Sequence, residues 1–193
     1  MKPQESKRER QYLHAHRLLI RVGLSLGMTF AWVFVFQYFL VASGSLPLSF
    51  LGTILVYATS QAVMMLMTPL SAAHLRRGMH GAMVLGACLC AAAFVVLGGT
   101  FAGNFSSPMG WGIVLFGILL GAYRALYWIP YRPHAASAAQ GPNALYEILI
   151  ALMPAFAGIA LATVPLGPLR LLFGAAALVL LSIVPIFALE NHG

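Results

Sequence analysis

Acidic residues are scarce in this chain, and aspartate is absent altogether. Glutamate supplies all 4 acidic residues, and charged residues of both signs make up only 8% of the 193 positions. Without aspartate, a Ser-His-Asp triad, an EF-hand loop and paired-carboxylate hydrolysis each lose a residue type on which they depend. The composition therefore counts against several common kinds of enzyme.

Cysteine and histidine are too scattered to form a redox or metal centre. Cys88 and Cys90 lie two residues apart, about 200° around a helix from each other, so they form no CxxC pair and are expected to be two packed thiols. No histidine or cysteine pair has metal-ligand spacing with supporting ligands. We therefore expect no enzyme activity, no cofactor and no metal.

Positive charge exceeds negative charge, and its distribution decides what the excess means. The chain carries 11 lysines and arginines and a formal net charge of +7 at pH 7, which in a soluble protein would suggest nucleic-acid binding. Here 61% of the residues are hydrophobic, and the basic residues flank long uncharged stretches. That pattern is typical of a membrane protein whose surroundings are lipid and whose basic residues set its orientation.

Four uncharged stretches define the predicted architecture. They cover residues 22–75, 78–123, 148–169 and 171–189. Roughly 20 apolar helical residues cross a bilayer core, so the first two stretches are each long enough for two crossings, with turn-forming clusters between them. We therefore expect an all-α polytopic membrane protein with six transmembrane helices, near residues 20–42, 50–70, 80–102, 109–130, 144–164 and 169–189.

Basic residues alternate between the predicted loops and indicate orientation. They crowd the N-terminal segment 1–19 and follow the second and fourth spans, whereas the turns after the first and third spans carry none. By the positive-inside rule both termini, including the tail 190–193, lie in the cytoplasm, and the membrane is expected to be a bacterial inner membrane. Arg170, at the outer start of the last span, is the one exception, and its side chain can snorkel to the interface.

The basic segment 1–19 has a second interpretation. A basic start before an apolar run also resembles a signal peptide, but the apolar run here exceeds the usual length of such a region and favours a retained span. Anionic headgroups are a reasonable partner for this segment. Five histidines fall in the basic regions, where we expect them to face solvent or headgroups: His14, His16, His74, His80 and His134.

Two ionisable side chains fall within the predicted spans, and each is a functional candidate because a charge in the membrane is costly. Arg124 lies in the fourth span. Glu147 lies in the first turn of the fifth, where Asn143 can cap the helix and the helix dipole favours a negative charge. The two can form a structural ion pair if these spans are neighbours, and a role in substrate or proton binding stays equally open.

The surroundings of Arg124 resemble the floor of a cavity. By their spacing, Gly117, Gly121 and Trp128 fall on the same helix face as Arg124. Such glycines also let helices pack closely. Three tyrosines stand beside this face: Tyr123, Tyr127 and Tyr131. A cation among aromatic rings and small residues can hold a polar or anionic solute, and the alternative is a structural arginine bonded to helix carbonyls.

Weaker polar positions occur in the first two spans. Trp32 and Gln37 lie in the first span, and Tyr57 and Gln61 share a helix face in the second. These side chains can line a water-filled cavity or bond between helices, and we slightly favour the cavity.

Three segments resemble the major facilitator superfamily of transporters. Segment 69–80 is similar to that family's basic loop between helices 2 and 3, although the acidic residue of that loop is missing. Segment 123–131 is similar to the arginine-bearing helix 4, and segment 154–158 to the Gly-Pro-rich part of helix 5. The resemblance implies a charge-pair or gating role for four residues, Arg76, Arg77, Arg124 and Glu147. It implies helix packing for Pro154 and Gly158, and the small-residue spacing of Gly117 and Gly121 predicts the same role for them.

The size of the chain departs from that family and implies a partner. Members usually have twelve helices in two halves, with the substrate site between them, whereas this chain supplies six. A homodimer about an axis normal to the membrane, or a separately encoded second half, would complete the architecture. The implied function is a half-size transporter that carries a small polar or anionic solute by alternating access, with spans 1, 2, 4 and 5 lining the cavity. The competing hypothesis is a non-transporting membrane subunit that stabilises or regulates a partner.

Overall fold

The computed structural model describes residues 3–75, 79–103, 109–138, 148, 151–153, 155–156 and 167–190. Within these ranges the regular secondary structure is entirely helical, as the uncharged stretches predict. The helices are α1 (Pro3–Ser43), α2 (Leu46–Leu75), α3 (Met79–Phe101), α4 (Met109–Ala138), α6 (Pro168–Leu181) and α7 (Val184–Glu190).

Five described stretches are long and apolar enough to cross a membrane. They match five of the six predicted spans, and the sixth, 144–164, lies outside the described residues apart from 148, 151–153 and 155–156. Several apolar helices of this length are compatible with an integral membrane protein. The stretches are Ala15–Ser43, Leu46–Ala73, Gly81–Phe101, Gly110–Trp128 and Leu169–Phe187.

The helices extend beyond the predicted spans. Helix α1 begins at Pro3, so the basic segment predicted as a separate N-terminal region continues into the first span as one helix. Helices α2 and α4 likewise run past the predicted ends of their spans. The reason is physical: bilayer thickness limits the apolar part of a helix, whereas polar and basic residues can continue the same helix outside it.

Glycine ends two of the helices. Gly44 follows α1 with φ 63°, and Gly103 follows α3 with φ 70°, a left-handed conformation that other residues rarely adopt. The Gly44 N–H donates to the Leu40 carbonyl at 2.9 Å, which closes the last turn of α1. Each glycine thus stops its helix and lets the chain reverse.

The last predicted span is interrupted. A turn at Ser182 separates α6 from α7, just before Pro185, whose ring nitrogen cannot donate to the preceding helical turn. The N–H of Ile186 donates to the Ile183 carbonyl at 3.0 Å instead of to Ser182. The break therefore leaves the Ser182 carbonyl without its helical partner.

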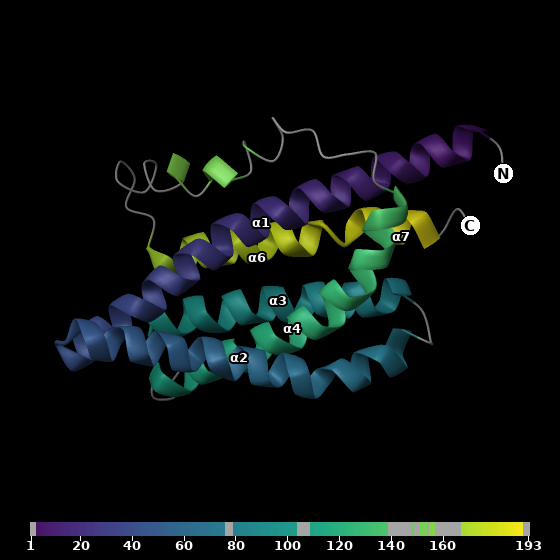
Figure 1. The fold of residues 1–193 in the computed structure, drawn as a ribbon. Helices are drawn as coiled ribbons and strands as arrows, with labels where there is room; N and C mark the ends of the chain where they lie inside the picture. Colours follow the sequence, from purple (N-terminus) through teal and green to yellow (C-terminus); the bar gives the residue numbers. More distant parts are fainter. Residues whose placement is uncertain are drawn as a thin grey trace.

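The five apolar helices close into a ring in which each packs most extensively against two neighbours, in the order α1, α2, α4, α3, α6 and back to α1, while α3 also touches α1 and α2. Figure 1 shows α1 and α6 side by side above α3, α4 and α2, with α7 against α1. Helices α4 and α6 run in the same direction along the bundle, and α1 begins at the end where α7 lies.

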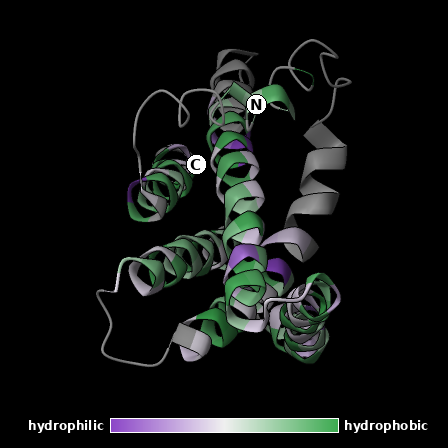
Figure 2. Ribbon diagram, turned by 90° about the vertical axis from the view of Figure 1, so that its left-hand side faces the viewer, coloured by the Kyte–Doolittle hydropathy of each residue, from purple (hydrophilic) through white to green (hydrophobic). Residues whose placement is uncertain are grey.

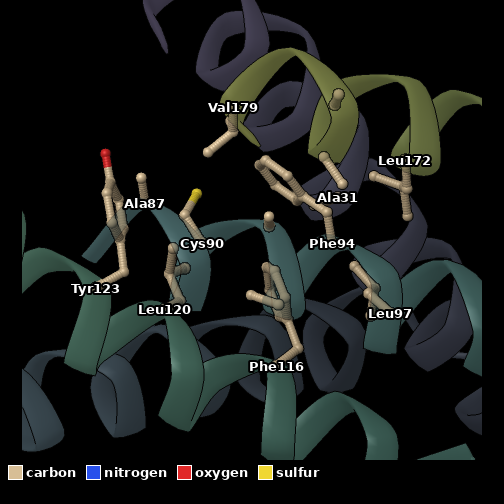
Figure 3. Close-up of a cluster of buried hydrophobic side chains, with 14 of the residues drawn as sticks. Ala31, Ala87, Cys90, Phe94, Leu97, Phe116, Leu120, Tyr123, Leu172 and Val179 are labelled. Atoms are coloured by element: carbon tan, nitrogen blue, oxygen red, sulfur yellow. The ribbon is translucent and has the colours of Figure 1, made fainter. Parts of the chain in front are cut away.

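Side chains from all five apolar helices contribute to the buried core of this ring, and Figure 3 shows those labelled from α1, α3, α4 and α6. Phe94 of α3 packs against α1 where Gly27 leaves room, since a Cβ at Gly27 would overlap the phenyl ring. Phe116 and Leu120 reach the same core from α4, and Val179 reaches it from α6. Hydrophobic residues occur along all the described helices (Figure 2), and many large ones are exposed at the outer surface.

Candidate functional site

Helices α2 and α4 approach each other through glycine. A Cβ at Gly117 would meet the Val56 carbonyl oxygen at 3.3 Å, and a Cβ at Gly121 would overlap the Ser60 carbonyl oxygen. Farther along α4, the Ser71 hydroxyl donates to the Ala125 carbonyl at 2.8 Å. This contact brings the backbones together and sets the position of the next turn of α4, which carries Arg124.

Arg124 binds α2 through its guanidinium group. Its Nη1 donates to the Ser60 hydroxyl at 3.2 Å, and its Cζ lies 5.3 Å from the centroid of the Tyr57 ring, within the range of a cation–π interaction. Arg124 is half-buried and close to the middle of the 30-residue helix α4, and Ser60 is close to the middle of the 30-residue helix α2. The charge therefore lies between the two helices and inside the apolar stretch of α4, four residues before that stretch ends at Trp128.

A row of aromatic rings continues from this arginine towards the core. Trp32 of α1 lies edge-on to Tyr57, with ring centroids 5.9 Å apart, and edge-on to Phe116 of α4 at 5.7 Å. Tyr57 is 47% exposed at the surface of the described bundle, whereas Phe116 is fully buried. We call these five residues the Arg124 cluster: Arg124, Ser60, Tyr57, Trp32 and Phe116.

The structure places several of the other predicted cavity residues in the core and not beside Arg124. Tyr123 and Tyr127 are buried, and Figure 3 shows Tyr123 beside Ala87 and Cys90 of α3. The ring of Trp128 packs on Tyr127, with centroids 5.5 Å apart. Tyr57 thus lies against Arg124, and Trp32 lies against Tyr57, whereas Tyr123 and Tyr127 of α4 contribute to the core.

Gln61 and Gln37 have different surroundings. Gln61 is half-buried one turn after Tyr57 on α2, and Gln37 is exposed on α1. The remaining predicted site residues lie outside the described part of the chain: Arg76, Arg77, Glu147, Pro154 and Gly158. The ion pair between Arg124 and Glu147 therefore stays a prediction.

The burial of His16 contradicts the prediction made from the sequence. We expect it from the sequence to face solvent or headgroups, yet it is completely buried. Its Nδ1 lies 2.6 Å from the Ser182 carbonyl oxygen, and its Nε2 lies 2.8 Å from the Tyr127 hydroxyl. Because a carbonyl only accepts, Nδ1 carries the proton, and in the neutral imidazole Nε2 accepts from Tyr127.

The break before α7 explains why His16 is buried here. The Ser182 carbonyl, released from its helical bond, receives a donor from α1 instead, so a polar group in the bundle is satisfied. Three elements meet at this point: α1, α4 and the turn between α6 and α7. We call His16, Tyr127 and Ser182 the His16 junction.

The two cysteines differ in their exposure. Cys90 is buried as predicted, whereas Cys88 is exposed on the surface of α3. In the described residues no group of three or more His, Cys, Asp or Glu side chains is placed to hold a metal ion.

Comparison of the chain with known protein families, characterised proteins and solved structures gives no match. The fold and the site therefore define a class only: a bundle of long apolar helices with a half-buried arginine between two of them. The resemblance to the major facilitator superfamily stays a prediction.

Proposed function

We propose that this chain is half of a membrane transporter, similar to one six-helix half of the major facilitator superfamily, and that it works as a dimer by alternating access. Arg124 would bind a polar or anionic group of the solute. The observation that carries the proposal is the position of this cation, half-buried between α2 and α4 and inside the apolar stretch Gly110–Trp128.

The energetics of a charge in a membrane support a functional role for Arg124. An arginine within a membrane span is costly, and such residues commonly mark a substrate or ion pathway. Among the residues that the structure describes, the guanidinium has one hydrogen bond, to the neutral hydroxyl of Ser60. An anionic solute would supply the opposite charge and occupy the other donors.

The helix neighbours are compatible with two inverted three-helix repeats, as in one half of a major facilitator transporter. In such repeats helices 1, 2 and 3 correspond to helices 4, 5 and 6, so α1 corresponds to α4 and α3 corresponds to α6. The pair α3–α4 then corresponds to the pair α6–α1, and both pairs are in contact. The pair α3–α6 corresponds to itself and is also in contact. A sixth crossing over 144–164 would return the chain between α4 and α6, which run in the same direction.

A second copy of this chain is the proposed partner. Among the side chains that the structure describes, those exposed on α3 and α6 are apolar apart from Cys88 and Arg170, which suits lipid. Helices α1 and α2 also expose apolar side chains, but Gln37 and Tyr57 are exposed among them, and an amide and a phenol are unfavourable against lipid tails. The exposed hydroxyls of Thr29 and Thr68 are satisfied by carbonyls of their own helices. We therefore propose that α1 and α2 face the second copy across the solute cavity.

The role of Arg124 is testable by transport in proteoliposomes. Uptake of labelled organic and inorganic anions, a neutral sugar and a cation is measured above protein-free vesicles, and then repeated with Arg124→Ala and Arg124→Lys. A lost charge-assisted hydrogen bond is worth about 1.5–3 kcal/mol, so we expect Arg124→Ala to weaken apparent solute affinity roughly 10- to 100-fold, with Arg124→Lys retaining part of it.

Arg170→Ala is the matched control for that experiment. Arg170 is exposed near the start of α6, so its removal changes the net charge by the same amount without touching the Arg124 cluster. Full uptake by Arg124→Ala would contradict the assignment of the site. Absence of uptake of any solute by the unaltered protein would favour the non-transporting subunit.

The dimer is testable by cross-linking in membranes. In a background with both native cysteines replaced, Tyr57→Cys on α2 is treated with a short bis-maleimide, and Phe173→Cys on the exposed apolar face of α6 serves as the control. We expect a covalent dimer on a denaturing gel from Tyr57→Cys alone. A dimer only from Phe173→Cys would contradict the proposed orientation, and no dimer from either would favour a separately encoded second half.

A further inference from the structure

We propose that the solute bound by the Arg124 cluster is an organic anion in which a carboxylate is attached to an aromatic or similarly flat apolar body. This inference rests on the proposed function and adds the chemical class of the solute. It follows from two neighbouring features of the cluster, a single cation and a row of rings.

The carboxylate is matched by Arg124, which Ser60 holds in place. A guanidinium presents planar N–H donors that suit the two oxygens of a carboxylate. Nη1 donates to the Ser60 hydroxyl at 3.2 Å, which orients the group on α2. Ser60 itself is completely buried, so a bound carboxylate meets the remaining N–H groups of the half-buried guanidinium.

The apolar body is matched by the rings beside the cation. Tyr57 lies under the guanidinium and is 47% exposed, so a bound molecule that reaches Arg124 also meets this ring. Trp32, half-buried and edge-on to Tyr57, extends the apolar surface towards the core. Offset or edge-on contacts with a second aromatic ring are favourable in addition to the burial of apolar area.

A small inorganic anion fits these groups poorly. Phosphate and sulfate are satisfied by several cations or N–H donors arranged around them, whereas the described cluster holds one arginine and two hydroxyl groups among three rings. A solute without an apolar part would leave the exposed face of Tyr57 unused. The phosphate of an anionic lipid is the other chemical source of a negative group in this position, and the test has to distinguish it.

The test measures binding directly and does not depend on transport. In a variant with Trp111→Phe and Trp128→Phe, Trp32 is the one remaining tryptophan and reports on the cluster by its fluorescence. The purified protein in a neutral detergent is titrated with benzoate, acetate, phosphate and, separately, phosphatidylglycerol. Because the phenyl group adds buried apolar area, we expect benzoate to bind at least about tenfold more tightly than acetate or phosphate.

Variants of the cluster make the result specific. Tyr57→Leu should reduce the preference for benzoate over acetate severalfold, whereas Tyr57→Phe should retain it. Leu48→Ala, an exposed apolar position near the start of α2, is the control that should change neither affinity. Arg124→Ala should weaken benzoate and acetate binding alike.

Each outcome decides between the two proposals. Benzoate preference that depends on Tyr57 supports the inference. Tighter binding of acetate or phosphate through Arg124 would overturn the aromatic class while leaving the proposed transporter intact. Binding of phosphatidylglycerol alone, together with no transport in proteoliposomes, would overturn both, because Arg124 would then be a lipid-headgroup site.

Discussion

Replacing Gly121 by leucine is expected to separate α2 from α4 and to destabilise the protein by more than about 3 kcal/mol. A Cβ at this position would overlap the Ser60 carbonyl oxygen and lie 2.8 Å from the Val63 Cβ. Backbone atoms of an α-helix cannot move aside as the end of a flexible side chain can, so the helices must part. The measurement is thermal unfolding in detergent, with the monodisperse fraction on size exclusion as a second readout.

Gly174 offers a matched control for this substitution. It lies on the exposed surface of α6, and a Cβ there would have no neighbour within 4 Å. Gly174→Leu is therefore expected to unfold at nearly the same temperature as the unaltered protein. Equal stability of the two leucine variants would contradict the close approach of α2 and α4, and with it the geometry that positions Arg124 over Tyr57.

Replacing His16 by alanine is expected to cost about 2–4 kcal/mol, because a buried carbonyl and a buried hydroxyl each lose a partner. The variant leaves the Ser182 carbonyl without its donor and the Tyr127 hydroxyl without its acceptor at Nε2. The free energy of unfolding is measured by titrating the protein from mild detergent into dodecyl sulfate and following its helical circular dichroism.

A double-mutant cycle separates this bond from the general loss of packing. Tyr127→Phe removes only the hydroxyl, so its cost should be smaller, and in a His16→Ala background it should be smaller still because the shared bond is already lost. Thr29→Ala is the control, since that exposed hydroxyl bonds only the Ser25 carbonyl of its own helix. Strict additivity of the His16 and Tyr127 variants would contradict the bond.

The sequence predicts the helices better than their ends. Long runs without charge reveal the apolar crossings because a charge in the membrane is costly, and this signal is independent of how the helices pack. The basic segment before the first span is partly helical in pattern, but the cost of a charge in the membrane says nothing about where its helix begins, and α1 begins at Pro3. The break between α6 and α7 has a local signal, Pro185 inside an apolar run, that indicates an interrupted helix.

The candidate site is only partly visible in the sequence. Arg124 is recognisable because it is a rare charge, and Tyr57 because it is a polar side chain in a long apolar run. Their contact, and the contribution of Ser60, depend on α2 and α4 being neighbours, which no local pattern reveals. Serine is so common in membrane helices that Ser60 gives no signal of its own.

His16 was obscured by its basic neighbours. A pattern along α1 does indicate its burial: buried residues recur every three or four positions, which places His16 at the beginning of one continuous buried stripe. That stripe consists of His16, Ile20, Gly23, Gly27, Ala31 and Val35. Reading the stripe outward from the apolar span, past Arg21 and Arg17, would have predicted a buried histidine.

The closed ring also determines the order in which the protein can be completed during synthesis. The partner of His16 at Ser182 is 166 residues farther along the chain, so α1 is made long before the residue that binds it has been translated. Helix α1 can pair with α2 early, but its contact with α6 forms only after residues 168–181 have been made. In nascent chains that stop before Pro168, α1 has no contact with α6 and His16 has no bond to Ser182. We therefore expect such chains to be preferred substrates for membrane quality-control proteases.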